Sequence, residues 1–382
     1  MKLARTRPAK TAALALLGAV ALTLTACGPG SVDDGGTTGG DDENTSEEGG
    51  AELSGTLAGS GASSQENAQN GWMAGFTEAN PGVTVSYDPT GSGTGREQFL
   101  NGSVLFAGSD AAFDEEELGM ASERCLDGEA LELPLYISPI AVIYNLPGVE
   151  AEHINLTPQA LAGIFAGEIT TWNDPAIAEA NPDIELPEIT VVPVNRSDDS
   201  GTTENFTEYL SAVAGDVWTH GPIETWPIPG TVSGAQTSGM IDTVSSQEGA
   251  IGYADASRAG DLGTAAIGVG EEFVPYSAEA AAAIVDASPA TEDATDKRLT
   301  IELARDTTES GTYPIVLISY LIACDTYENE ADATNVAAYL SYIASPEGQD
   351  RAAEPDVAGS APISEDLRTR VLAAIDSISA AS

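Results

Sequence analysis

Basic residues are scarce in this chain of 382 residues, which has 14 lysines and arginines against 60 aspartates and glutamates and a formal net charge of -46. A protein that binds nucleic acid needs a basic surface to neutralise phosphate groups. The composition therefore excludes nucleic acid as a partner. An anionic ligand must be held by local dipoles and by one or two buried arginines, against the field of the whole protein.

Residue types that carry out catalysis are also few. The two histidines, His153 and His220, stand in unrelated polar contexts. No Cys–His or His–Glu cluster has the spacing of metal ligands, and no Gly-x-Ser-x-Gly motif occurs. With 60 carboxylates in the chain, neighbouring acids are expected by chance. The sequence therefore predicts a protein that is not an enzyme and that uses no cofactor and no bound metal.

Residues 1–26 have the pattern of an export signal, with a basic segment followed by an apolar run from Ala12 to Leu24. The run is too short and too poorly flanked to be interpreted as a membrane span. It ends in Leu24-Thr25-Ala26-Cys27, which resembles a bacterial lipobox. We therefore expect cleavage before Cys27 and a lipid on that cysteine. Plain secretion with an incidental cysteine is the alternative.

Residues 27–50 are rich in Gly, Thr, Asp and Glu and contain almost nothing apolar. Such a segment cannot bury a core and is typical of a solvated, acidic, disordered tether. As a flexible coil it would hold the folded part roughly 25–30 Å from its anchor.

Only two cysteines, Cys125 and Cys324, remain after Cys27. Export places them in an oxidising location, so we predict a disulfide between them. Two separate buried thiols are the alternative.

One local pattern recurs in the next part of the chain: a short apolar run, a polar loop rich in glycine and serine, and a helical pattern. The loops are Gly59–Ser64, Gly91–Arg96 and Gly108–Asp110. The repetition predicts a parallel sheet with helices on both faces, in which ligands lie at the carboxyl ends of the strands. Nucleotide binding is a weak alternative, because the second loop lacks the Gly-Lys-Ser/Thr ending of a P-loop.

A further junction of this kind lies at residues 195–204. The apolar run Ile189–Val194 predicts a buried strand before it, and a helical pattern follows. Free backbone N–H groups and the helix dipole at such a junction favour an anion. Arg196 adds a planar fork that suits tetrahedral oxyanions, and Ser200, Gly201 and Thr202 add donors and a close backbone approach. A helix cap with a surface arginine is the alternative, but the recurring loops favour a shared anion site.

Asp110 is an acid within a group of loops that otherwise favour anions. A carboxylate in such a site would repel a fully ionised oxyanion such as sulfate. It would accept a hydrogen bond from an anion that still carries a proton, such as hydrogen phosphate, so repulsion provides the selectivity. A surface cap is the alternative role for Asp110.

The rest of the sequence predicts further alternation of strands and helices. Residues 131–145 contain two strand-like runs split by Ser138-Pro139, and Thr157-Pro158 begins a helix. Further predicted elements are a helix over 233–246, a strand over 249–253, a helix over 278–286 capped by Ser277, an apolar run over 313–323, a helix over 333–343 and a helix from Ser364.

In these loops the sequence resembles the phosphate-binding proteins of bacterial high-affinity phosphate ABC transporters, over most of residues 51–382. The matching segments are Gly59–Ser64, Tyr87–Gly95, Phe106–Asp110, Trp172–Asp174 with Asn181-Pro182, Arg196–Thr202, Ile251–Tyr253 and Tyr313–Ile315. Together and in this order they are specific, whereas any one of them alone is not.

The resemblance implies an α/β fold of the two-domain periplasmic-binding-protein (Venus-flytrap) type, with a hinge between the domains. We expect domain I to comprise residues 51–143 and 312–382, and domain II residues 144–311. The two domains would close on a dehydrated phosphate without a bound metal.

The resemblance also implies which residues contact phosphate. From domain I these are Ser63, Ser64, Ser92 and Asp110, the last as acceptor of the phosphate proton. From domain II they are Arg196 as the cationic clamp and Ser200, Gly201 and Thr202 as donors, with Asp198 orienting Arg196. The family usually has threonine and an aromatic residue where this chain has Ser63-Ser64, and often glycine at Asp199.

The sequence therefore predicts an extracytoplasmic receptor, anchored to the cell membrane by a lipid on Cys27. It would capture inorganic phosphate and deliver it to ABC transporter permease subunits, and we expect it to be a monomer. A receptor for another oxyanion, such as sulfate, molybdate or tungstate, is the nearest alternative. An exported phosphatase is a more distant one.

Overall fold

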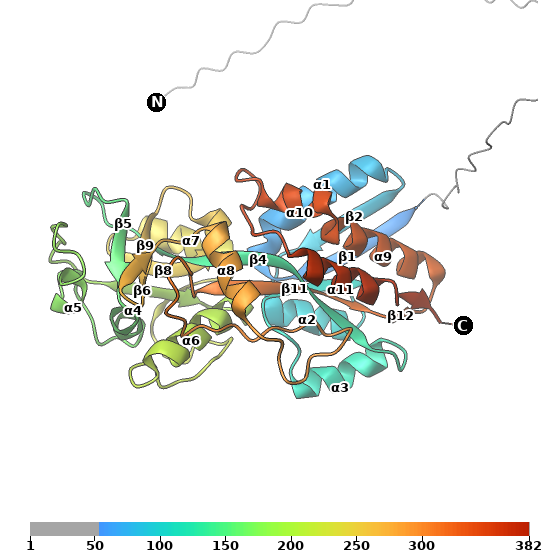
Figure 1. The fold of residues 1–382 in the computed structure, drawn as a ribbon, viewed down its shortest axis with the longest axis horizontal. Coiled ribbons are helices and arrows are strands. Elements are labelled where there is room, and N and C mark those ends of the chain that lie inside the picture. Colours follow the sequence, from blue (N-terminus) through green and yellow to red (C-terminus); the bar gives the residue numbers. More distant parts are fainter. Residues whose placement is uncertain (1–52, 382) are drawn as a thin grey trace, which may run out of the picture. The chain divides into compact units, whose positions relative to one another are not determined.

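The computed structural model describes residues 53–381 (Figure 1). The predicted export signal, the lipid site at Cys27 and the tether at residues 27–50 lie outside the described residues. Within the described part the chain has a mixed α/β fold built on an 11-stranded sheet. No helix in that part is both long enough and apolar enough to cross a lipid bilayer.

The sheet is parallel at its two ends, but its middle is antiparallel where a parallel sheet was predicted. Along its main path the strands lie in the order β2 (Val83–Asp88), β1 (Gly55–Gly61), β3 (Phe106–Ser109), β11 (Val316–Cys324), β4 (Ala130–Tyr144), β8 (Ala250–Asp255), β6 (Val192–Arg196) and β7 (Val232–Gly234). A branch beside β4 contains β9 (Gly263–Val269), which pairs with β5 (His153–Leu156) and β10 (Glu272–Val274). Strand β11 is antiparallel to both β3 and β4, and β4 is antiparallel to β8.

The helices lie around the two ends of this sheet (Figure 1). In chain order they are α1 (Glu66–Ala79), α2 (Ser92–Leu100), α3 (Glu115–Arg124), α4 (Pro158–Phe165), α5 (Pro175–Ala178), α6 (Gly201–Ala214), α7 (Gln236–Ser246), α8 (Ala278–Ala287), α9 (Glu330–Ala344), α10 (Pro346–Ala353) and α11 (Glu365–Ile375). Helices α1 and α9 contact the β1–β2 end, and α6 and α7 contact β8 at the other end. We call these the first half and the second half of the sheet. Two short strands, β12 (Thr326–Tyr327) and β13 (Ser379–Ala380), form a separate pair.

Strand β4 is continuous, so the predicted split at Ser138-Pro139 is wrong. All fifteen residues of β4 are buried. Pro139 pairs with Val316 of β11, and the next residue, Ile140, pairs with Asp255 of β8. A proline lacks an N–H and interrupts a strand only where that donor is needed. Here it lies where β4 changes partner, so the strand runs from the first half of the sheet into the second.

The helix predicted over residues 233–246 begins later, at Gln236. Val232–Gly234 instead form β7, which pairs in parallel with β6. A Cβ on Gly234 would lie 2.2 Å from the carbonyl oxygen of Gly239, so glycine is needed at this tight entry into α7.

Other helix boundaries follow their predicted caps. Side-chain oxygens of Thr157, Ser277 and Ser364 accept the backbone N–H groups of Ala160, Ala280 and Leu367 at the starts of α4, α8 and α11.

The structure contains a disulfide between Cys125 and Cys324, the pairing that the sequence predicted. Both residues are fully buried. The bond joins the end of α3 to the end of the central strand β11.

Candidate functional site

Three glycine-rich loops meet at one edge of the sheet in the first half. Strand β1 is parallel to both β2 and β3, so the chain leaves all three strands on the same side. The Gly91 N–H donates to the Gly61 carbonyl at 2.9 Å, and the Asp110 N–H donates to Ser92 Oγ at 3.2 Å. These bonds bring Ser63, Ser92 and Asp110 into one buried region.

The segment after β6 approaches the same region from the second half. A Cβ on Gly201, the first residue of α6, would lie 2.8 Å from the Cβ of Asp110 and 2.8 Å from Ser92 Oγ. A Cβ on Gly91 would lie 2.7 Å from Asp198 Oδ2 and 3.8 Å from Arg196 Nη2. The residues predicted to form the anion site therefore come together, and two glycines permit the close contact between the halves.

Asp110 is the centre of the polar contacts in this region. Its carboxylate accepts hydrogen bonds from Ser64 Oγ at 2.7 and 2.9 Å, from Thr202 Oγ1 at 2.7 Å and from Ser319 Oγ at 2.5 Å. Burial raises the pKa of Asp110, while the three hydroxyls and the charge of Arg196 lower it, and the net shift is upward. Three hydroxyl hydrogens meet a carboxylate that has about four lone-pair sites, so acceptor capacity remains.

Ser319, on β11, contacts Asp110 but was not among the predicted site residues. Gln65 Nε2 donates to Ser319 Oγ at 2.6 Å. Because a hydroxyl has a single hydrogen, this contact leaves the Ser319 hydrogen for Asp110. Ser319 is a polar residue within the buried apolar strand Val316–Cys324, and that exception to the pattern was the only signal in the sequence.

Asn205, on α6, is a second residue that the sequence prediction missed. Its side-chain amide donates to the Asp110 carbonyl at 2.7 Å and to the Gly201 carbonyl at 2.9 Å. It therefore ties the backbone of the Asp110 loop to the first turn of α6.

Arg196 ends β6 and is held by the predicted partner, Asp198. Its Nε donates to Asp198 Oδ1 at 2.9 Å, and its Nη2 bonds to Asp198 Oδ2. Asp198 Oδ1 also accepts the N–H of Gln236 at 2.9 Å, at the start of α7. The Arg196 side chain is 3% exposed. The ion pair and the burial fix a planar cation beside the N-terminus of α6, where the helix dipole also favours an anion.

The remaining predicted donors are buried and bonded within the protein. Ser200 Oγ caps α6 by accepting the Thr203 N–H at 3.2 Å. Ser63 Oγ accepts the N–H of Thr237 at 3.0 Å and lies 3.0 Å from the Thr237 hydroxyl. Ser63 therefore joins the first half of the sheet to the start of α7, a contact that the sequence did not predict.

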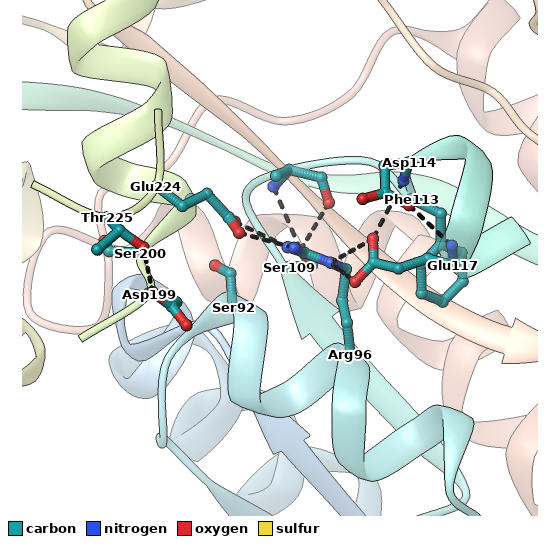
Figure 2. A network of polar contacts seen from close by, with 12 residues as sticks. Ser92, Arg96, Ser109, Phe113, Asp114, Glu117, Asp199, Ser200, Glu224 and Thr225 are labelled. Carbon is teal, nitrogen blue, oxygen red and sulfur yellow. Dashed lines mark hydrogen bonds and ion pairs between the residues drawn. The ribbon is translucent and has the colours of Figure 1, made fainter. Parts of the chain in front are cut away.

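Arg96 adds an ion-pair network at one side of this region (Figure 2). Its guanidinium bonds to Glu117 of α3 and to Glu224, which lies between α6 and β7. Among residues 53–381 no group of three or more His, Cys, Asp or Glu has an arrangement that could hold a metal ion.

The fold and the converging loops are those of a binding protein, and a comparison with protein families identifies which one. The family model for the PBP superfamily domain matches residues 46–347, and the chain belongs to that superfamily. Phosphate-binding protein PstS 2 of Mycobacterium tuberculosis is 33% identical over 382 residues, covering 96% of this chain and 98% of that protein. PstS 3 of the same species is 34% identical over 373 residues, with the same coverage. The chain is a member of the PstS family.

Solved structures agree with this family at the level of the fold. A high-affinity periplasmic phosphate-binding protein, PfluDING, bound with phosphate, has a TM-score of 0.69 and 22% identity, covering 84% of this chain and 93% of that one. A phosphate-binding protein from Stenotrophomonas maltophilia has a TM-score of 0.66 and 19% identity, with 84% and 94% covered. The predicted α/β periplasmic-binding-protein fold is confirmed.

Proposed function

We propose that this chain is an extracytoplasmic receptor that binds inorganic phosphate between the two halves of its sheet for an ABC transporter. The PstS relatives are named as phosphate-binding proteins. The single observation that carries the proposal is the environment of Asp110. It is a buried carboxylate, with acceptor capacity left after three hydroxyl donors, against the N-terminus of α6. That combination suits an anion that carries its own proton.

In this proposal the binding residues come from both halves. Ser63, Ser92 and the backbone N–H of Ser64 donate to phosphate from the first half, and Asp110 accepts a hydrogen bond from the proton of hydrogen phosphate. Arg196, held by Asp198, supplies the charge from the second half. The donors at the start of α6 are Ser200 and the backbone N–H groups of Gly201 and Thr202, so the ligand replaces part of its hydration shell by fixed dipoles.

Domain closure follows from this division of the binding residues. We assign residues 51–143 and 312–382 to one domain and 144–311 to the other, with the hinge where β4 and β11 connect them. A phosphate that bonds to both domains stabilises the closed state, because only that state makes both sets of bonds.

The cellular setting belongs to the same proposal. A lipid on Cys27 would anchor a monomer to the cell membrane, and the acidic segment 27–50 would act as the tether. The receptor would release phosphate to permease subunits in that membrane.

Replacement of Arg196 tests the assignment of the site. We expect Arg196→Ala to weaken phosphate binding by at least ~30-fold, since truncating one partner of a buried charge pair costs about 2–5 kcal/mol. Arg370→Ala, at an exposed position of α11, is the matched control and should bind as the wild type does. Isothermal titration calorimetry measures both. Equal affinities for the two variants would contradict the assignment.

A further inference from the structure

Arg96 is bound by two carboxylates, and the one from Glu224 connects the two halves of the sheet (Figure 2). Its Nε donates to Glu117 Oε1 at 2.8 Å, and Glu117 belongs to α3 in the first half, as Arg96 itself does. Its Nη1 and Nη2 donate to Glu224 at 2.9 and 2.7 Å, and Glu224 belongs to the second half. Figure 2 shows the two carboxylates on opposite sides of the guanidinium.

The contact with Glu224 has the geometry of a strong ion pair. It is bidentate, and the side chains of Arg96 and Glu224 are only 8% and 19% exposed. Burial alone would lower the pKa of Arg96, but the bonds and charges of Glu224 and Glu117 raise it overall. Arg96 therefore stays charged, and solvent screens the pair less than it screens a surface pair.

Both partners are attached to segments of the candidate anion site. Arg96 lies one helical turn after Ser92 on α2, and its Nη1 donates to Ser109 Oγ at 3.0 Å. The Glu224 carbonyl accepts the Ser200 N–H at 3.3 Å. The adjacent Thr225 hydroxyl donates to Asp199 Oδ1 at 2.5 Å. Breaking the ion pair would therefore loosen the segment that carries Ser200 from the helix that begins at Ser92.

We propose that Arg96 and Glu224 form a latch that holds the two halves together over the anion site, and that both are positioning residues for the ligand. The guanidinium is engaged on both sides by carboxylates, so the latch acts through the closed arrangement of the site and not by contact with the anion. This inference rests on the proposed phosphate receptor.

A latch of this kind has a distinct effect on binding. It raises the population of the closed state, and the apparent affinity depends on that population whatever anion is bound. Loss of the latch should therefore weaken all ligands of the site by the same factor. A residue that contacts the anion should instead change the ratio between two anions.

Glu224→Gln and Glu117→Gln are the test variants, because each removes one carboxylate from the same arginine. We expect Glu224→Gln to weaken phosphate and arsenate by the same factor, about 10-fold, with faster release. Glu117→Gln should bind within about 2-fold of the wild type, since the cross-half pair remains and glutamine still serves the capping box of α3. The Arg96→Gln/Glu224→Gln double variant should lose little more than Glu224→Gln alone.

Affinity that is unchanged in Glu224→Gln would overturn the latch. A higher affinity would mean that the freed Arg96 binds the anion, and unequal factors for phosphate and arsenate would mean direct contact by Glu224. Either result would also overturn it.

Hydrogen exchange without any anion tests the latch separately from phosphate binding. The Ser200 N–H and the Gly93 N–H, which donates to the Asp199 carbonyl at 3.4 Å, should exchange faster in Glu224→Gln than in Glu117→Gln. Equal exchange in the two variants would refute the latch. A wild-type protein that binds no phosphate but shows this difference would refute the proposed receptor and leave the latch standing.

Discussion

At the scale of single residues, we propose that Asp110 gives the site its selectivity. Its three hydroxyl partners orient the carboxylate, and Arg196 provides the opposite charge. Sulfate brings no proton at neutral pH, so it would leave the remaining acceptor site of Asp110 facing an anion. Hydrogen phosphate brings the missing hydrogen.

Asp110→Asn should therefore reduce discrimination between phosphate and sulfate. The amide has the size of the carboxylate but no charge, and it donates hydrogen bonds. We expect the phosphate-to-sulfate affinity ratio to fall by at least ~10-fold, which is about 1.4 kcal/mol. Calorimetric titration of the variant with each anion measures the ratio. A ratio equal to that of the wild type would show that Asp110 does not select the ligand.

Ser319→Ala tests the residue that orients Asp110 from β11. The change removes a hydrogen bond to a charged group and leaves Gln65 Nε2 without this acceptor, so we expect about 10-fold weaker phosphate binding. Ser138→Ala, a buried hydroxyl on the neighbouring strand β4, is the control. Binding is measured at a temperature where both variants are folded. Equal phosphate binding by the two variants would show that Ser319 has no role at the site.

The sequence predicted the residues of this site that follow a local pattern. Ser63, Ser92 and Asp110 stand in glycine-rich loops after strands, and Arg196 stands before a helix. Ser319 could not be found in this way, because it is 209 positions from Asp110 along the chain. The contact depends on β11 pairing with β3, which no local pattern specifies.

At the scale of elements, the first turn of α6 carries a half-buried acid, Glu204, besides the proposed anion donors. Burial raises the pKa of Glu204 to about 7, with further contributions from the charges of Glu224 and Glu208, while Arg96 and Arg305 act against the shift. A cavity of about 290 Å³ adjoins Glu204 and is also lined by Asp110 and Arg305.

Glu204 should make the protein less stable as the pH rises. The pKa of Glu204 is higher in the folded than in the unfolded chain. Its contribution to the free energy of unfolding is therefore fully present below about pH 4.5 and is lost as the pH rises through about 7. Glu204→Gln should remove this loss. We expect the variant to be more stable than the wild type at pH 8, by on the order of 2 kcal/mol, and not at pH 5.

Denaturant unfolding of both proteins at pH 5 and pH 8 measures this difference. Asp255, whose pKa burial raises to about 6, adds a pH dependence that both proteins share, so the comparison isolates Glu204. A variant that is equally stabilised at both pH values would contradict the interpretation.

Element boundaries were predictable where a capping residue marks them, as at Thr157 and Ser277. Boundaries were not predictable where the pairing of distant strands determines where an element begins or ends. Pro139 was expected to break a strand, but it lies where β4 exchanges β11 for β8. Likewise, Ser233 and Gly234 were expected in a helix but belong to β7, which pairs with β6.

At the scale of the whole molecule, the central strands β4 and β11 connect the two halves of the sheet. Local repetition predicted parallel strands, and this holds for β1 with β2 and β3. The antiparallel centre was missed, because the chain returns to it only at Val316–Cys324, far from its partner strand Ala130–Tyr144. The direction of such a distant segment is set by the packing of the whole domain.

The disulfide joins two cysteines that are far apart along the chain and so closes a long loop. Cys125 and Cys324 are separated by 199 positions, and cross-links over long loops restrict the unfolded chain most. We expect the Cys125→Ser/Cys324→Ser variant to lose about 2–5 kcal/mol of unfolding free energy. It should keep its affinity for phosphate, because neither cysteine touches the proposed site. Denaturant unfolding measures the loss of stability, and calorimetry measures the affinity for phosphate. A large loss of affinity with unchanged stability would contradict both.

The most direct test of the central claim is calorimetric titration of the wild-type protein with phosphate and with sulfate under the same conditions near neutral pH. We expect saturable binding of one phosphate per chain and far weaker binding of sulfate, because Asp110 would accept a hydrogen bond from a proton that sulfate does not carry. Tight binding of sulfate, or no binding of phosphate, would contradict it.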